Sequence, residues 1–324
     1  MGFLPTCTGT RVFISWVRHT TRSASFARGI GAESFFIDVG SSLGPLKYVP
    51  RALRTLRILV SLRPAAVFCM NPPYFLGLAA WWYCLVFRAC FVLDSHTAAF
   101  DQPEWVRIEP LHRFLVRRAA CSTVTNVELA KRVESMGGRA VVVSDIPYEM
   151  PGGTYEVEPD RFTVCFCCTY ANDEPILEVF EAARTLPDIR VYVTGNDKKA
   201  TDEIRRAKPE NVTLTGYLSD EAYAGLLRGV SAILVLTTRD FTMQRGGSEA
   251  VTVGKPLITS DWPVLREIFS RGTVHVDNTA NGIQAGIEEV RRNYDRYINE
   301  IAELKRIRQQ RWQTAKQELE SFLA

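Results

Sequence analysis

Short apolar runs and helical patterns alternate twice along the chain, and this alternation constrains the fold more than any other feature. In the first half, strand-like runs such as RVFISWV and AAVFCM alternate with segments of helical spacing such as 50–62. A second alternation begins at RFTVCFC and continues to TVHV. Alternation of this kind is typical of parallel sheets with right-handed helical crossovers. We therefore expect an α/β fold with two Rossmann-like domains in tandem.

The segment PYEMPGGTYEVEP, residues 147–159, is rich in Pro and Gly and interrupts the alternation. It divides the chain into parts of ordinary domain size. The predicted organisation is an N-terminal domain 1–147, a linker 148–159, a second domain 160–296 and a C-terminal helix 297–324. Ligands of such sheets bind beyond the carboxyl ends of the strands, so two facing domains are expected to form one deep cleft.

The C-terminal segment carries an apolar stripe at helical spacing that needs a surface to pack on. Its residues are Tyr297, Ile301, Leu304, Trp312, Ala315, Leu319 and Phe322. One interpretation passes this helix back to the first domain, and the other packs it on the second domain as a terminal cap.

Charge is spread unevenly between the two halves. Residues 1–150 hold 17 Lys and Arg against 10 Asp and Glu, whereas residues 151–324 hold 22 against 26. This excess is too weak for a nucleic-acid-binding protein, but it suits an anionic acceptor or an anionic membrane surface.

The cysteines show no paired metal spacing, and Cys165, Cys167 and Cys168 lie in an apolar run that favours buried reduced thiols. No metal or other cofactor is expected. Residues 1–10 lack the pattern of a secretory signal, which predicts a cytoplasmic chain. The most apolar segment is Pro73 to Leu93. Arg88 and the change in its apolar pattern predict a buried helix at 74–87 followed by a strand at 90–93 rather than a membrane span.

The stretch TTRDFTMQRGGSEAVTVGKPLITSDWPVLREIF holds the strongest functional pattern. Arg245, Gly246 and Gly247 place a cation beside two small residues at the start of a helix, which outlines a diphosphate site. Glu249 is expected in the first turn of that helix, where its carboxylate could accept ribose hydroxyls. A favourable charge at a helix start is the plainer interpretation of Glu249.

This stretch resembles the nucleotide-sugar site of the retaining glycosyltransferases of family four, which have the GT-B fold. The resemblance rests on Glu249, the GKP at 254–256 and the element PVLRE. It implies a donor site built from Gly216, Tyr217, Arg245, Gly246, Gly247, Ser248 and Glu249. It also implies that DSHTAAF is the interdomain loop that carries a functional histidine, here His96.

Two departures from the family pattern affect the site. The family has a second Glu eight residues before the ribose-binding one, and Phe241 stands there, with Asp240 beside it as the alternative catalytic carboxylate. The Arg and Lys that normally follow the first strand of the second domain are replaced by CTYANDEP. Arg245 is therefore the candidate for the diphosphate charge.

Three loops of the first domain follow predicted strand ends. His96 lies in one of these loops and is the second catalytic candidate, besides Asp240. The other two loops carry the predicted acceptor-binding residues Arg18, His19, Arg22 and Asn71.

The helix after Leu46 places Lys47, Arg51 and Arg54 on one face. Another face is apolar and consists of Val49, Leu53, Leu56 and Val60. Such basic faces are usually just solvated. Lipid-linked acceptors are common in the family. The alternative to a solvated face is therefore peripheral contact with an anionic membrane at its cytoplasmic face.

The resemblance implies a glycosyltransferase that moves a sugar from a nucleotide donor, by family usage a UDP-sugar, to a glycan or lipid-linked acceptor with retention. Two alternatives stay open: a nucleotide-sugar epimerase of the same fold, and a non-catalytic nucleotide-sugar-binding subunit. No G-x-G-x-x-G follows the first strand of either domain, which disfavours a dehydrogenase.

Overall fold

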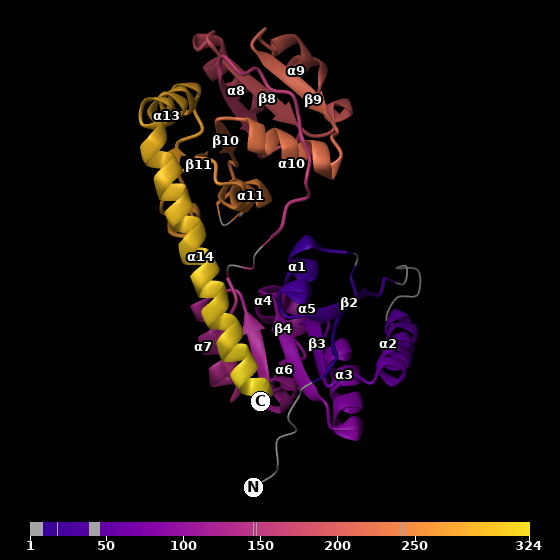
Figure 1. The fold of residues 1–324 in the computed structure, drawn as a ribbon. Coiled ribbons are helices and arrows are strands. Elements are labelled where there is room, and N and C mark those ends of the chain that lie inside the picture. The colour runs from indigo at the N-terminus through magenta and orange to yellow at the C-terminus, as the bar shows by residue number, and fades with distance from the viewer. Residues whose placement is uncertain are drawn as a thin grey trace. The chain divides into compact units, whose positions relative to one another are not determined.

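The computed structural model describes residues 9–17, 19–38, 46–144, 146, 148–240, 242 and 244–324. The chain divides into two compact units (Figure 1). Unit 1 consists of Met1–Pro147 and Arg308–Ala324, and unit 2 of Tyr148–Ile307. Each unit holds one six-stranded parallel sheet with helices on both faces, which confirms the predicted α/β architecture.

The sheet of unit 1 has the strand order β2-β1-β3-β4-β5-β6. Its strands are β1 (Arg11–Ser15), β2 (Ala32–Phe36), β3 (Ala66–Asn71), β4 (Cys90–Ser95), β5 (Cys121–Val124) and β6 (Ala140–Val142). Its helices are α1 (Thr21–Gly29), α2 (Tyr48–Leu62), α3 (Tyr74–Phe87), α4 (Ala98–Asp101), α5 (Pro103–Val106), α6 (Glu109–Arg118) and α7 (Val127–Ser135). One core holds side chains of α2, α3, α6 and α7, and a second core holds side chains of α1 and the end of the chain.

The sheet of unit 2 has the strand order β12-β11-β10-β7-β8-β9. Its strands are β7 (Phe162–Phe166), β8 (Ile189–Thr194), β9 (Val212–Gly216), β10 (Ala232–Val235), β11 (Leu257–Ser260) and β12 (Thr273–Val276). Its helical elements are α8 (Ile176–Thr185), η2 (Asp197–Lys199), α9 (Asp202–Ala207), α10 (Asp220–Gly229), α11 (Arg245–Val253), α12 (Pro263–Ile268) and α13 (Ala280–Arg292).

The apolar segment 73–93 forms α3 and β4, as the sequence predicts. Buried side chains of both elements pack in the same core of unit 1. Across the described residues, the helices are too short or too polar to cross a membrane.

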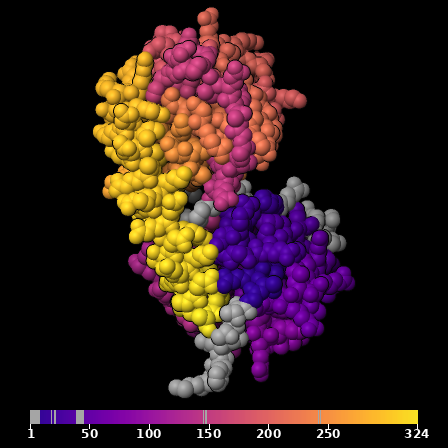
Figure 2. All heavy atoms as spheres, in the orientation of Figure 1, coloured from indigo at the N-terminus to yellow at the C-terminus, as the bar shows by residue number. Residues whose placement is uncertain are grey.

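The last helix, α14 (Tyr294–Leu323), contributes buried side chains to both units. Ile301 and Leu304 belong to a core of unit 2, whereas Trp312 and Leu319 belong to a core of unit 1. The Trp312 ring meets the Phe26 ring edge to face, with centroids 6.2 Å apart. Figure 2 shows the end of this helix, in yellow, lying against the indigo part of unit 1.

The segment 148–159, predicted as a linker, packs along α10 within unit 2. Tyr155 and Val157 pack against a core of that unit. A Cβ at Gly225 of α10 would come within 2.3 Å of the Thr154 backbone, so this glycine lets the segment approach the helix closely.

Candidate active site

In unit 2, β7 lies between β10 and β8, so the crossovers run in opposite directions on its two sides. Ligands of doubly wound sheets bind at such a point, beyond the carboxyl ends of the strands. The loop after β7 and the loop after β10 therefore flank the candidate nucleotide site. The second of these loops leads into α11.

Helix α11 begins at Arg245, so both glycines lie in its first turn. The prediction that Glu249 lies in the first turn is therefore wrong, because that turn holds no acidic residue. The helix extends over both glycines because each packs tightly on a neighbour. A Cβ at Gly246 would lie 2.9 Å from the Cβ of Cys167, and one at Gly247 would lie 2.5 Å from the Phe269 ring.

Glu249 is a buried carboxylate that is held by an arginine and a tyrosine. It is 3% exposed, and its Oε1 lies 2.6 Å from Nε of Arg245, one helical turn earlier. Its Oε2 accepts a hydrogen bond of 2.6 Å from the Tyr223 hydroxyl of α10. The sequence pattern brings Arg245 and Glu249 into one site, but it predicted neither their ion pair nor the contact with Tyr223.

Arg245 connects this carboxylate to the beginning of unit 2. Its Nη2 donates a hydrogen bond of 2.6 Å to the Tyr148 hydroxyl, and its guanidinium lies 4.8 Å from the centre of the Tyr148 ring. The Arg245 side chain is half exposed. A cation therefore stands at the N-terminal end of α11, where the helix dipole also favours an anion.

In the loop after β7, the Glu174 carboxylate binds backbone N–H groups of the same loop. Glu174 accepts hydrogen bonds from the N–H groups of Thr169 and Ala171, at 2.9 Å each, and one from the Thr169 hydroxyl at 3.1 Å. This acid replaces an external anion at amides that would otherwise be free. The absence of the family's Arg and Lys from this loop was visible in the sequence, but the role of Glu174 in it was not predicted.

The remaining donor-site candidates lie at the same edge of unit 2. Gly216 ends β9 with φ of 68°, a left-handed conformation that favours glycine, and Tyr217 beside it is 82% exposed. Ser248 and Asp240 are half-buried. Phe241, at the place of the family's additional Glu, lies outside the described residues.

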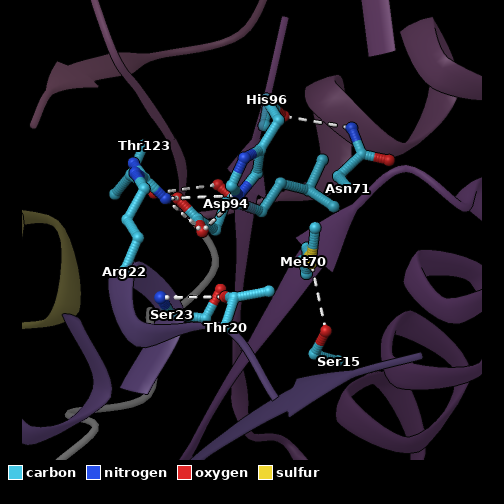
Figure 3. Close-up of polar contacts among 11 residues, drawn as sticks. Ser15, Thr20, Arg22, Ser23, Met70, Asn71, Asp94, His96 and Thr123 are labelled. Atoms are coloured by element: carbon cyan, nitrogen blue, oxygen red, sulfur yellow. Dashed lines mark hydrogen bonds and ion pairs between the residues drawn. The ribbon is translucent and has the colours of Figure 1, made fainter. Parts of the chain in front are cut away.

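In unit 1, Asp94 binds Arg22 and His96 at the carboxyl end of β4 (Figure 3). Its Oδ2 lies 3.0 Å from Nη1 of Arg22 and 3.0 Å from Nε2 of His96. Thr123, its register partner on β5, donates a hydrogen bond of 2.9 Å to Oδ1. Asp94 thereby fixes the side chains of Arg22, in the first turn of α1, and of His96, in the loop after β4.

Asp94 is fully buried yet stays ionised. Burial by itself would raise the pKa of this carboxyl group, but the charge of Arg22, the contact with His96 and the Thr123 hydroxyl together hold it well below its usual range. The buried charge is therefore compensated by a cation that is itself 30% exposed.

Asn71 is fully buried and supports the His96 loop. Its Nδ2 donates to the Ser95 hydroxyl at 3.0 Å and lies 3.0 Å from Nε2 of His112, while its backbone carbonyl accepts the His96 N–H at 2.8 Å. These contacts place Asn71 under the loop rather than on its surface. His19 is exposed and packs on Phe36 with ring centroids 4.8 Å apart. Arg18 lies outside the described residues.

Comparisons with known proteins agree with this architecture. Residues 177–323 match a protein family described as glycosyl transferase-like. A glycosyltransferase from Rickettsia africae has a TM-score of 0.67 at 11% identity, with 97% of this chain and 98% of that chain covered. Anabaena Alr3699/HepE, solved in complex with UDP and glucose, has a TM-score of 0.61 at 12% identity, with 96% and 98% covered.

The chain has the GT-B glycosyltransferase fold. The predicted GT-B fold is thereby confirmed. The same fold also occurs in a proposed UDP-N-acetylglucosamine 2-epimerase from Listeria monocytogenes, with a TM-score of 0.60, 11% identity and 90% and 91% of the two chains covered. No curated protein matches the sequence.

The three cysteines at the end of β7 and just after it are free thiols, as predicted. Cys165 and Cys168 are buried, and Cys167 is half-buried. Burial raises the pKa of the Cys168 thiol well above its ordinary value, so it stays protonated at neutral pH. In the part of the chain that the structure describes, no three His, Cys, Asp or Glu residues come together as a metal site.

Proposed function

We propose that the chain transfers a sugar from a nucleotide-sugar donor to a glycan or lipid-linked acceptor, with retention at the anomeric carbon. The observation that supports this most is the pair formed by Glu249 and Arg245 at the start of α11, beside the switch point of the second sheet. A buried carboxylate next to a half-exposed cation suits a ribose joined to a diphosphate.

In this proposal Glu249 accepts hydrogen bonds from the ribose hydroxyls. Each carboxylate oxygen can accept two hydrogen bonds, so the contacts to Arg245 and Tyr223 leave acceptor capacity for a ligand. Arg245 turns toward the diphosphate, supported by the N-terminal end of α11 with Gly246, Gly247 and Ser248. The exposed ring of Tyr217, next to Gly216, offers a face on which the base stacks.

The UDP that the Anabaena complex contains supports uridine as the base of the donor proposed here. Arg245 and the helix dipole carry the charge of the departing diphosphate, and the transfer is proposed to need no metal ion. A chelator such as EDTA is then expected to leave turnover unchanged.

His96 is the proposed contact of the reacting sugar, held in place by Asp94, and Asp240 is the proposed second catalytic group. His96→Ala is expected to lower kcat about a hundredfold and to change KM for the donor little, because the contact gains strength only in the transition state. Equal losses in kcat and in donor affinity would make His96 a ground-state contact instead.

Product analysis with radiolabelled nucleotide sugars tests the proposed reaction. A glycosyltransferase yields labelled acceptor in addition to the nucleotide diphosphate, and the anomeric proton of the product reports retention. The structural match to the Listeria protein supports epimerisation as the second candidate, which would return an epimerised donor without any acceptor. Binding without conversion would indicate a nucleotide-sugar-binding subunit.

A further inference from the structure

A stretch of 55 residues, 39–93, contains no Asp or Glu. It includes both α2 and α3. Its cations are Lys47, Arg51, Arg54, Arg57, Arg63 and Arg88. Any surface formed by these two helices alone is therefore positively charged or neutral.

The same two helices expose large apolar side chains to solvent. On α3, Trp82 is 60%, Leu85 61% and Val86 56% exposed. On α2, Val49 is 57% and Leu53 52% exposed. We call these side chains, with the exposed Arg54 and Arg57, the α2–α3 face.

The inward side of α2 explains why its apolar side chains face outward. Thr55 is fully buried and accepts a hydrogen bond of 2.8 Å from Nε1 of Trp16. Arg51 is buried as well and donates to Asp38 at 3.2 Å. Because these polar contacts fix which side of the helix packs inward, Val49 and Leu53 are left on the outer side.

The two helices of the α2–α3 face lie beside each other (Figure 1). Tyr48 of α2 and Phe75 of α3 have ring centroids 4.8 Å apart. On its other side, α3 contacts α6 through Trp81 and Phe114, at 4.9 Å, and the Arg118 guanidinium lies 5.5 Å from the Phe114 ring.

We propose that the α2–α3 face docks on the surface of an anionic lipid membrane. Side chains such as Trp82 and Leu85 would enter the boundary between headgroups and acyl chains, while Arg54 and Arg57 bind lipid phosphates. Neither helix has to span the bilayer, since an amphipathic helix lies in the plane of the interface.

The charge and the apolar area of this face disfavour a second copy of the chain and a nucleic acid as binding partners. A second copy meeting through the same face would bring acid-free, basic surfaces together, and like charges repel. A nucleic acid would satisfy the arginines but would leave the exposed indole and aliphatic side chains in water. An anionic membrane satisfies both the charges and the apolar area.

Vesicle co-sedimentation tests the proposal with the full chain and without any nucleotide sugar, so its outcome is independent of the proposed transfer. The wild-type chain is expected to sediment with vesicles that contain phosphatidylglycerol and not with pure phosphatidylcholine, and added salt is expected to weaken the binding. Absence of binding to the anionic vesicles, or equal binding to both, would overturn the proposal.

Two double variants separate the apolar and the charged contributions. Trp82→Ser with Leu85→Ser, and Arg54→Gln with Arg57→Gln, are each expected to lower the partition coefficient about tenfold. The controls are Val127→Ser, an equally exposed apolar side chain on α7, and Arg206→Gln with Arg292→Gln, which removes the same charge from unit 2.

The controls are expected to bind as the wild type does. If the double variants bind as tightly as the controls, the α2–α3 face is not the docking surface. Sedimentation velocity without lipid provides a further check. A dimer that disappears in the Trp82→Ser and Leu85→Ser variant would assign the face to self-association and overturn the proposal.

Discussion

The two units each place a buried carboxylate at the carboxyl edge of a parallel sheet, but they hold it differently. Glu249 in unit 2 pairs with Arg245 one turn away on the same helix, and that arginine is half exposed. Asp94 in unit 1 is fully buried and joins Arg22, His96 and Thr123 from separate elements. We propose that the first carboxylate meets a ligand, whereas the second organises the side chains around it.

The helix α14 offers the largest test of this division into units. Trp312→Ala is expected to destabilise unit 1, and Leu304→Ala to destabilise unit 2, each by about 3–4 kcal/mol, because both buried side chains would leave cavities. Amide exchange resolved along the chain shows which unit loses protection. If both substitutions affect the same unit, the assignment of α14 to two cores is wrong.

Removing the Asp94 carboxylate is expected to lower the free energy of unfolding more than removing the Glu249 carboxylate. Asp94→Ala leaves the Arg22 cation without its partner in a largely buried place and should cost about 3 kcal/mol. Glu249→Ala should cost only about 1 kcal/mol, because Arg245 can turn to water. Denaturant unfolding measures both values, and equal losses would contradict the contrast between the two sites.

Acid pH is expected to weaken unit 1 through His112, below the His96 loop. Burial lowers the pKa of this imidazole from 6.5 to about 4. The unfolded chain therefore binds the proton first, and stability falls as pH decreases from 6.5 to 4, by about 2–3 kcal/mol. His112→Gln should flatten this dependence in unfolding curves recorded across the window. An unchanged slope would show that His112 is not the titrating group.

The smallest expected effect concerns Tyr223, whose hydroxyl donates the second hydrogen bond to Glu249. Tyr223→Phe removes the hydrogen bond to Oε2 but keeps the ring, so affinity for UDP should fall about threefold. Titration calorimetry can resolve this change. A loss as large as that of Glu249→Ala would mean that Tyr223 itself contacts the ligand.

The sequence predicts local features of both units well. The helix cap at Asn126, the left-handed Gly254 that ends α11, and the apolar pair α3 and β4 all follow from short-range patterns. Such features depend on spacing that can be read along the chain.

Contacts between distant residues could not be predicted in this way. Arg22 and Asp94 are 72 residues apart, and only the parallel order of β1, β3 and β4 brings them together. The orientation of α2 depends on Trp16 and Asp38, which lie outside that helix. The close packing of Gly247 on Phe269, which lies later in the chain, is a further contact of this kind.

Calorimetric titration with UDP tests the central claim most directly, that the start of α11 binds the nucleotide of the donor. Glu249→Ala and Arg245→Ala each remove charge-assisted hydrogen bonds worth about 1.5–3 kcal/mol, so both should weaken UDP binding at least about tenfold. Glu267→Ala, an exposed glutamate on α12, serves as the matched control and should bind as the wild type does. Wild-type affinity for UDP in both the Glu249 and the Arg245 variants would contradict the account and place the nucleotide elsewhere.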